Sequence, residues 1–287
     1  MKVRKAVITA AGWGTRFLPV TRSQPKEMLP LVDKPLIQYA VEEAVSSGIE
    51  QIIMVTAMGK RAIEDYFDRS MELETYLERK GETEMLRKML EISSLTDICY
   101  VRQKEQLGLG NAVLTVKDVV GNEPFVVILP DDVIDSRVPG IRQMLEIYDK
   151  YNSSVVAVEK VGEEDIRKYG IIDQEPVSSR VYRVKRLIEK PEPADTTSRL
   201  GIIGRYVLPP AIFDILKYTP PGKGGEVQLT DALSTLLQDA KLYACELTGT
   251  RYDAGTPLGW LKANVALGLK HGDIGPDFKE YIKQIMK

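Results

Sequence analysis

Short apolar runs rich in β-branched residues alternate along the first half of the chain with segments whose apolar positions recur at helical spacing. The runs KAVITA, QIIMVTA, ICYVRQ, GNAVLTV and PFVVILPDD follow one another, and LIQYAVEEAVSSG predicts a helix between the first two. Alternation of strands and helices indicates an α/β fold with a doubly wound, mostly parallel sheet. Such sheets bind ligands at the carboxyl ends of their strands. Three of these ends carry unusual residues, since KAVITA leads into AGWGTR, ICYVRQ into KEQLGLG and FVVILP into DDVID.

The second half has a different pattern. After Lys150 the apolar runs are flanked by Gly and Pro, which favours mixed or antiparallel pairing in a smaller lobe. Helical spacing returns at PAIFDILKY, LTDALSTLLQDA and PLGWLKANVALGLKHG. We therefore divide the chain into halves at 1–150 and 151–287, which we expect to form one continuous domain.

Residues 60–95 form a charged segment punctuated by Leu and Met, with a natural break at Gly81. This pattern predicts two or three surface helices inserted between strands of the first half. The charges are of both signs, which favours a solvated helical face over a surface for a partner protein.

Composition narrows the class of protein. A formal net charge of −2 over 287 residues offers no basic face for nucleic acid. No apolar run approaches the roughly 20 residues of a membrane span, and the first residues lack a signal-peptide core, so we expect a cytoplasmic protein. Cys99 and Cys245 each lie inside a strand-like run, which favours two buried thiols in a reducing compartment over a metal or redox pair.

The segment after the first strand, AAGWGTRFLPVTRSQPKEMLP, has the chemistry of a phosphate-binding loop. Its residues with little or no side chain let backbone N–H groups approach a phosphate chain; they are Ala10, Ala11, Gly12 and Gly14. Arg16 adds a forked cation and Lys26 a point charge. Neither GxGxxG nor GxxxxGK is present, which disfavours dinucleotide and P-loop ATPase sites. Spacing alone leaves open a tight turn with surface cations.

Two strand ends carry carboxylates. Asp131 and Asp132 close the most apolar strand, where adjacent charges are costly unless a cation or solvent compensates them. Mg²⁺ suits such oxygen ligands, although a turn or helix cap would also use an Asp-Asp pair. If the strand continued, Asp132 would point away from Asp131. In the second half, Glu189 and Lys190 close a strand and could bind a sugar hydroxyl and a phosphate, or form a surface pair.

The loop segment resembles the signature of nucleoside-diphosphate-sugar pyrophosphorylases, and its long form with FLP and PKEMLP resembles the bacterial UTP-glucose-1-phosphate uridylyltransferases. The resemblance covers nearly the whole chain and continues in order through QLGLGNAV, LPDD, YGIID, EKP, GRYVL, GEVQLTDAL and YDAGTP. It implies a Rossmann-like, glycosyltransferase-A-like fold with a sugar-binding lobe. It also implies an Mg²⁺-dependent enzyme that makes UDP-glucose and pyrophosphate from UTP and glucose 1-phosphate. One departure is Thr21-Arg22, where the family commonly has Thr-Lys.

The same resemblance implies roles for individual residues. It makes Asp131 the metal-binding aspartate, with Asp253 as a second candidate, and it places Gln103 and Gly108 against the uracil ring. The nucleotide loop then comprises Ala10, Ala11, Gly12, Gly14 and Thr15.

On the sugar side, Glu189 would accept hexose hydroxyl protons, Lys190 would contact the sugar phosphate and Gly170 would lie beside the sugar. Glu226 would be a pocket residue without an assigned role. The three cations expected to carry catalysis are Arg16, Lys26 and Lys190.

The reaction needs no protein nucleophile. A sugar phosphate has its second pKa near ~6 and can attack the α-phosphorus of UTP directly, and the only histidine, His271, ends a helix. Three alternatives stay open: a pyrophosphorylase that uses dTTP, a silent ligand-sensing subunit, and an interaction protein acting through residues 60–95. We expect a homodimer or homotetramer.

Overall fold

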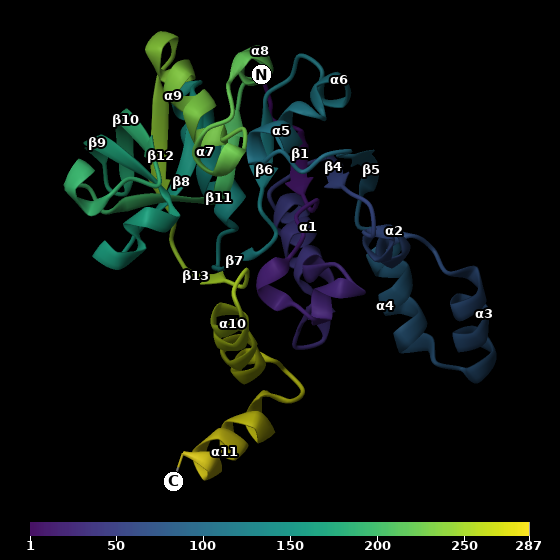
Figure 1. Cartoon of the computed structure of the whole chain (residues 1–287). Helices are drawn as coiled ribbons and strands as arrows, with labels where there is room; N and C mark the ends of the chain where they lie inside the picture. The colour runs from purple at the N-terminus through teal and green to yellow at the C-terminus, as the bar shows by residue number, and fades with distance from the viewer. Residues whose placement is uncertain (287) are drawn as a thin grey trace.

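Nine strands form one mixed sheet in the computed structural model, which describes residues 1–286 (Figure 1). In spatial order they are β5 (Asp97–Arg102), β4 (Gln51–Thr56), β1 (Lys5–Thr9), β6 (Phe125–Ile128), β11 (Leu200–Leu208), β8 (Ser154–Lys160), β12 (Leu242–Glu246), β10 (Val181–Glu189) and β9 (Gly170–Ser178). Strands β5, β4, β1 and β6 are parallel, whereas β11 runs antiparallel to both β6 and β8. The predicted α/β fold with a mostly parallel first half and a mixed second half is confirmed, and the sheet is continuous across residue 150.

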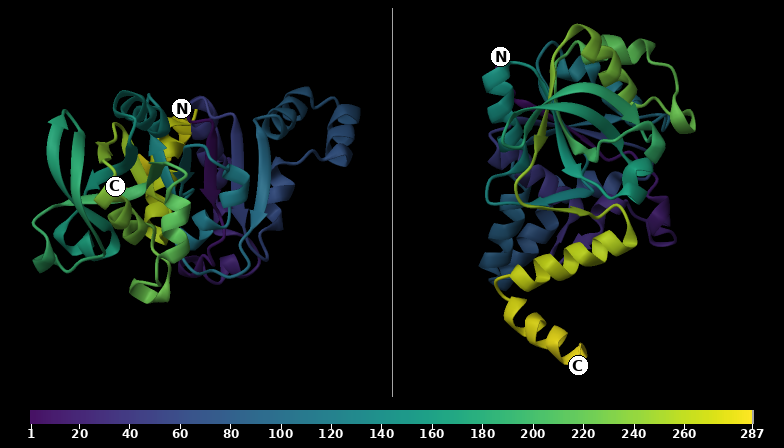
Figure 2. Two further views of the ribbon diagram at one scale, coloured as in Figure 1. Left: turned by 90° about the horizontal axis from the view of Figure 1, so that it is seen from above. Right: turned by 90° about the vertical axis from the view of Figure 1, so that its left-hand side faces the viewer.

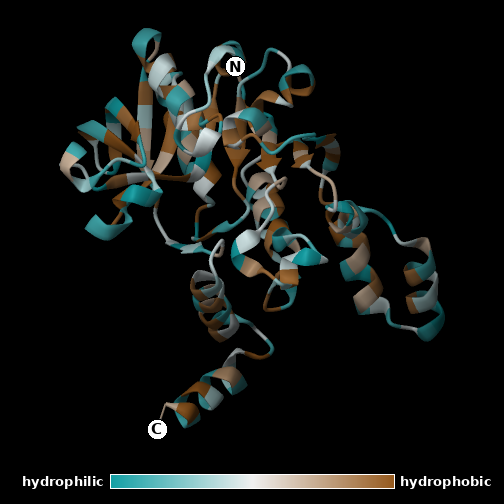
Figure 3. Cartoon of the chain, in the orientation of Figure 1, coloured by the Kyte–Doolittle hydropathy of each residue, from teal (hydrophilic) through white to brown (hydrophobic). Residues whose placement is uncertain are grey.

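Two hydrophobic cores cover the two faces of this sheet, because successive strand residues alternate between them. Val7 and Val127 contribute to one core, and Ile8 and Val126 contribute to the other. The first core is covered by α5 (Leu109–Leu114), α6 (Lys117–Val120), α8 (Ile212–Tyr218) and α9 (Leu229–Asp239). The second is covered by α1 (Leu36–Ser46), α2 (Arg61–Phe67) and α7 (Gly140–Tyr151). Figure 3 shows the central strands β1, β4 and β6 as predominantly hydrophobic, as burial on both faces requires.

A helical hairpin projects from the β5 edge of the sheet, at the end opposite β9 and β10 (Figure 2). It consists of α3 (Met71–Lys80) and α4 (Thr83–Ser93), joined at Gly81, whose φ of 73° closes α3. With α2, the segment predicted at residues 60–95 therefore holds three helices. Helix α2 differs from the expected surface helix, because Ile63 and Phe67 pack into the core.

The strand predicted to carry Asp131 and Asp132 at its end is shorter than expected. It stops at Ile128, and Asp132 begins a separate strand, β7 (Asp132–Asp135), that pairs with β13 (Thr250–Asp253). The change of direction occurs because the N–H of Asp132 turns back to the carbonyl of Leu129, at 3.2 Å. Asp131 thus lies in a turn between two strands.

The remaining elements are short or peripheral. After β13 the chain forms α10 (Pro257–Lys270) and α11 (Gly275–Ile285), which extend away from the sheet (Figure 1). A small ribbon pairs β2 (Pro30–Leu31) with β3 (Lys34–Pro35). The 3-10 helices are η1 (Thr15–Phe17), η2 (Val20–Arg22), η3 (Lys26–Met28), η4 (Glu163–Lys168), η5 (Pro193–Asp195) and η6 (Lys223–Gly225).

Both cysteines lie in strands, as predicted. Cys99 is half-buried in β5 and Cys245 is buried in β12, where burial raises the pKa of its thiol to about 12. His271 follows α10 directly, with Nε2 3.2 Å from a carboxylate oxygen of Asp33. Among the helices of residues 1–286, none is long and apolar enough to cross a membrane.

A substitution at Ile128 tests how tightly β6 is packed in the core. Its side chain is fully buried at the end of β6, so Ile128→Ala should leave a cavity and lower the free energy of unfolding by about 2–5 kcal/mol. Met71→Ala, on an exposed position of α3, should change it by less than about 0.5 kcal/mol. Urea unfolding curves compare the two, and equal effects would contradict the assignment of Ile128 to the core.

Candidate active site

A cleft of about 940 Å³ opens at the edge of the sheet where its parallel strands end. The predicted site residues that line it come from both halves of the chain: Arg16, Asp131, Gly170, Glu189, Lys190, Glu226 and Asp253. Parallel strands bring their carboxyl ends to one edge, which explains why segments after β1 and β6 meet here. The fold therefore brings Arg16 of the predicted phosphate loop and the predicted sugar residues into one cleft. Lys26 reaches this cleft through Asp131, whereas Gln103, Gly108 and the small residues of the loop do not line it.

The loop after β1 is shaped by its small residues. The N–H of Ala10 continues the strand ladder by donating to the carbonyl of Val55 at 2.8 Å. A Cβ on Gly12 would meet nothing within 4 Å, so the space beside this backbone is open. Gly14 has a φ of 66° and precedes η1, which begins at the exposed Thr15. The left-handed conformation at Gly14 suits glycine because other side chains rarely adopt it.

Two side chains brace this loop. Thr21 Oγ1 donates to the carbonyl of Gly14 at 2.8 Å, and Gln106 Nε2 donates to the carbonyl of Ala11 at 2.9 Å. Gln106 belongs to the loop after β5, so it ties two strand ends together. The sequence analysis named Thr21 only as the residue before Arg22, where the chain departs from the family pattern, and it missed Gln106.

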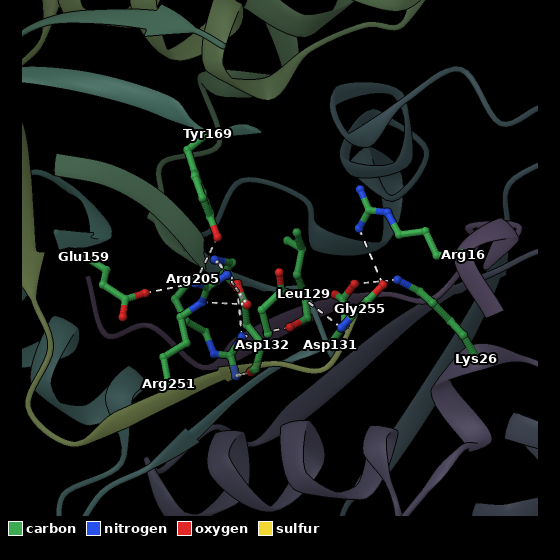
Figure 4. Close-up of polar contacts among 12 residues, drawn as sticks. Arg16, Lys26, Leu129, Asp131, Asp132, Glu159, Tyr169, Arg205, Arg251 and Gly255 are labelled. Carbon is green, nitrogen blue, oxygen red and sulfur yellow. Dashed lines mark hydrogen bonds and ion pairs between the residues drawn. The ribbon is translucent and has the colours of Figure 1, made fainter. Parts of the chain in front are cut away.

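Lys26 and Asp131 form the central contact of the site (Figure 4). Lys26 Nζ lies 2.6 Å from Asp131 Oδ2, and both side chains are only partly exposed. Burial lowers the pKa of Lys26, but the carboxylates of Asp131 and Glu27 together more than compensate, so the pKa is raised. Burial raises the pKa of Asp131, but Lys26 overcomes this effect and the pKa is lowered. Each group thus keeps the other charged. Arg16 Nη1 lies nearby, 3.5 Å from the carbonyl of Gly255.

Asp253 lies beside Asp131, with Gly255 between them. Asp253 Oδ1 accepts from the N–H of Gly255 at 3.0 Å. A Cβ on Gly255 would stand 2.6 Å from Asp131 Oδ2 and 3.0 Å from Asp253 Oδ1, so the two carboxylates flank one small space. Within residues 1–286, no three His, Cys, Asp or Glu side chains gather as a metal cluster. Two carboxylates fit Mg²⁺, which usually keeps waters and also binds substrate phosphates.

The Asp132 side chain accepts hydrogen bonds on the other side of the turn. Its Oδ2 accepts from the N–H of Gly204 at 2.7 Å and its Oδ1 from Nε of Arg251 at 2.7 Å. Burial raises the pKa of Asp132, and Arg251 offsets only part of this effect. Adjacent aspartates therefore have different partners, and Asp131 is the one beside Lys26 and Asp253.

Gln103 and Gly108 lie at the end of β5. Gln103 is 4% exposed, and its Nε2 donates to Oδ1 of Asn111 at 2.7 Å. Gly108 has a φ of 100° and directly precedes α5. A Cβ there would stand 2.7 Å from Cβ of Glu226 and 2.9 Å from the carbonyl of Val227. The close approach of the GEVQ segment explains both the glycine and the place of Glu226 in the cleft.

The residues predicted for the sugar side lie together. Glu189 Oε1 is 3.0 Å from Nζ of Lys190, and a Cβ on Gly170 would stand 2.9 Å from Oγ1 of Thr230 and 3.3 Å from Oε2 of Glu189. Lys190 has a φ of 45°, unusual for a side chain of its size. Lys223 Nζ donates to the carbonyl of Lys190 at 2.7 Å, and this bond stabilises the turn.

A buried ion pair lies beneath the nucleotide loop. Glu27 Oε2 is 2.7 Å from Nζ of Lys60, and the two side chains are 1% and 7% exposed. Burial raises the pKa of Glu27 despite Lys60. Lys60 is the residue directly before α2, so the pair anchors η3 to the start of α2. The positions of Glu27 and Lys60 in the sequence gave no indication that the two side chains would pair. Residues that contribute to the site and were missed from the sequence are Glu27, Lys60, Gln106, Arg205, Lys223, Thr230 and Arg251.

A loop of small residues with two cations, facing two carboxylates at the end of a parallel sheet, suits substrates that carry several phosphates. Residues 5–268 match the family model described as Nucleotidyl transferase, and the chain belongs to this family. The prediction of the family from sequence motifs is confirmed.

Particular relatives are closely similar. The chain is 50% identical over 286 residues to the UTP-glucose-1-phosphate uridylyltransferase YngB of Bacillus subtilis (strain 168), covering 100% of this chain and 96% of that protein. A UDP-glucose pyrophosphorylase complexed with UDP-glucose is 45% identical, with a TM-score of 0.87 over 94% of this chain and 100% of that one. A UTP-bound UGPase from Acinetobacter baumannii is 41% identical, with a TM-score of 0.91 over 98% and 99%.

The Glu27–Lys60 pair provides a test of the anchor below the loop. Removing one partner of a buried pair leaves an uncompensated charge, so Glu27→Gln and Lys60→Gln should each lower the free energy of unfolding by about 3–5 kcal/mol. The double variant should recover part of that loss. Chemical denaturation of the four proteins measures the coupling, and strictly additive losses would show that the two side chains do not interact.

Proposed function

We propose that this chain transfers the uridylyl group of UTP to glucose 1-phosphate and releases pyrophosphate, giving UDP-glucose. The observation that carries the proposal is that Lys26 and Asp131 meet at the cleft that Glu189 and Lys190 also line. A nucleotide loop and a hexose phosphate site must be adjacent for this reaction. The names of the similar proteins, and the UTP and UDP-glucose bound to two similar structures, support the same substrates.

The metal in this proposal is Mg²⁺, held by Asp131 and Asp253. The two carboxylates flank one small space beside Gly255 and leave the remaining coordination positions to water and phosphate oxygens. When bound, such an ion neutralises charge on the reacting phosphates.

The side chains divide the remaining work by position. Lys190 binds the attacking sugar phosphate, and its charge reduces the repulsion between that phosphate and the α-phosphate of UTP. Arg16, Lys26 and the backbone amides from Ala11 to Thr15 hold the departing pyrophosphate, whereas the N–H of Ala10 is already bonded to Val55. Glu189 and Gly170 orient the hexose, which aligns the phosphate oxygen for in-line attack.

Recognition of the base rests on Gln103 and Gly108. Gln103 Nε2 donates one N–H to Asn111, which leaves its second N–H and its carbonyl oxygen to complement the edge of uracil. At Gly108 the space for a side chain is filled by Glu226 and Val227, so Gly108 can meet the ring only through its backbone. A thymine ring has the same hydrogen-bonding edge, so dTTP is the alternative substrate to test.

A pyrophosphate-release assay tests the proposal most broadly. All common nucleoside triphosphates are combined with several hexose 1-phosphates, with and without Mg²⁺. UTP with glucose 1-phosphate and Mg²⁺ should give the highest kcat/KM. Faster reaction with dTTP would support the thymidylyl alternative, and silence in every combination would support a ligand-sensing subunit.

The chain's location and assembly complete the proposal. Its two unpaired thiols suit a reducing compartment such as the cytoplasm. A homodimer or homotetramer is supported by exposed apolar residues along α10 and α11: Leu261, Val265, Leu269, Tyr281 and Ile285. An apolar helix face of this kind is ordinarily covered.

The state of assembly can be measured directly. Light scattering after size exclusion should give twice or four times the mass of one chain. Leu261→Glu with Val265→Glu should shift the population toward single chains, because two carboxylates would be desolvated in the contact. A parent protein that elutes as a single chain at micromolar concentration would contradict the assembly.

Substitutions of Lys190 and Arg16 should affect different substrates, because the two side chains are assigned to different ends of the cleft. Lys190→Ala should impair the use of glucose 1-phosphate and leave UTP binding nearly unchanged, whereas Arg16→Ala should weaken UTP binding. A charged hydrogen bond contributes about 1.5–3 kcal/mol, so each loss should be about tenfold to a hundredfold. Initial-rate kinetics and calorimetric titration with UTP separate the effects, and the reverse pattern would mean that the two sides are assigned backwards.

A sequential mechanism is expected because, within residues 1–286, no histidine or cysteine lines the cleft as a nucleophile. His271 lies beyond α10 beside Asp33, and Cys245 is buried with a raised pKa. No uridylyl-enzyme should form, so both substrates must be bound before pyrophosphate leaves and the configuration at phosphorus should invert. Labelled pyrophosphate should exchange into UTP only when sugar phosphate or UDP-glucose is added. Exchange by sugar-free enzyme would demonstrate a covalent intermediate.

A further inference from the structure

A buried arginine lies directly behind the turn that carries Asp131. Arg205, in β11, is 1% exposed. Its Nη1 donates to the carbonyl of Leu129 at 2.9 Å, and its Nη2 donates to the carbonyl of Asp132 at 2.6 Å (Figure 4). These two carbonyls stand on either side of Asp131 in the sequence, so one guanidinium spans the turn.

Glu43 fixes the guanidinium from the other side. Its Oε2 lies 2.7 Å from Nη2 of Arg205, and its Oε1 also accepts from the N–H of Ile141 at 3.0 Å. The pair thus connects α1 and the start of α7 to the turn between β6 and β7. Packing alone would not need a charged group here, because apolar residues often replace buried ion pairs without loss of stability.

Other groups complete the restraint on the turn. Arg251 Nη1 lies 2.9 Å from Oε2 of Glu159, so the guanidinium that holds the side chain of Asp132 is itself fixed. The carbonyl of Asp131 accepts from the N–H of Ala254 at 2.8 Å. These contacts restrain the backbone of Asp131 and the side chain of Asp132, whereas the Asp131 carboxylate lies at the cleft beside Lys26.

We propose that Arg205 is a positioning residue for Asp131: by joining the carbonyls of Leu129 and Asp132 it sets where the Asp131 carboxylate stands. This inference rests on the proposed role of Asp131 as a metal ligand. The planar fork of arginine can donate to two carbonyls and a carboxylate at once, whereas a lysine ammonium is a point charge and cannot keep that geometry. A displacement of about 1 Å at such a site costs roughly a hundredfold in rate.

The test compares Arg205→Lys with Phe213→Leu in the full chain. Phe213 is buried in α8, where it stacks on Phe125, so its variant loses stability without touching the turn. Mn²⁺ replaces Mg²⁺ as the probe, and the free ion is counted by electron paramagnetic resonance in the presence of UTP. Arg205→Lys should weaken Mn²⁺ binding about tenfold or more, as loss of a group that orients a ligand does. Phe213→Leu should bind Mn²⁺ like the parent.

Kinetics supply a second readout. Arg205→Lys should lower kcat while the KM for glucose 1-phosphate changes less than about twofold, because Lys190 and Glu189 are not displaced. If Arg205→Lys does not fold, Glu43→Gln takes its place: it removes the carboxylate that fixes the Arg205 guanidinium and should weaken Mn²⁺ binding about threefold, less than loss of the guanidinium itself.

Asp131→Asn separates failure of this inference from failure of the proposed function. Unchanged Mn²⁺ binding in folded Arg205→Lys, or in Glu43→Gln where it replaces that variant, with weakened binding in Asp131→Asn, would overturn the positioning role and leave the metal assignment intact. Unchanged binding in Asp131→Asn would overturn both.

Discussion

The ion pair between Lys26 and Asp131 joins the two segments on which the proposed chemistry depends. One segment is the loop after β1 and the other is the turn after β6, and each places a charged group where burial disfavours it. Because each charge compensates the other, both groups remain ionised at the cleft before a substrate arrives. A preorganised arrangement of this kind avoids the cost of reorienting dipoles and charges during the reaction.

One continuous sheet holds the two sides of the cleft in a fixed relation. Parallel strands β1, β4, β5 and β6 present the loop, Gln103 and Asp131 at one edge, and β9 and β10 of the mixed part present Gly170 and Glu189. Strand β11 lies between these parts and supplies Arg205, which grips the turn of Asp131. The same strand therefore connects the two parts of the sheet and stabilises the centre of the site.

Local sequence patterns predicted most strands and helices, because apolar periodicity acts over a few positions. The run GNAVLTV, grouped with the strands, is an exception, since Leu109–Leu114 form helix α5. Local patterns also failed where a distant partner decides the conformation. The strand carrying Asp131 and Asp132 looked continuous, yet the backbone turns at Leu129 where β11 and Arg205 meet it. The sequence also did not predict the hydrogen bonds among Asp132, Arg205 and Arg251, because these residues are far apart in the chain.

The Glu27–Lys60 pair and the contact of Lys223 with the carbonyl of Lys190 could not be predicted either. Charged residues in loops are usually solvated, and nothing in their spacing reveals burial against a partner 33 positions away. The family resemblance pointed to Asp131, Glu189 and Lys190, but not to the groups that hold them. Those groups become visible only when the complete fold brings distant segments together.

The central claim, that Asp131 and Asp253 hold the divalent ion at the end of β6, is tested most directly by crystallography. Crystals grown with Mn²⁺ and a non-hydrolysable UTP analogue would be measured for anomalous scattering from manganese. If Asp131 and Asp253 are the ligands, we expect a peak within about 2.0–2.3 Å of a carboxylate oxygen of Asp131, with Asp253 and a phosphate oxygen also in contact. A peak elsewhere, with Lys26 and Asp131 still paired and no metal beside them, would contradict it.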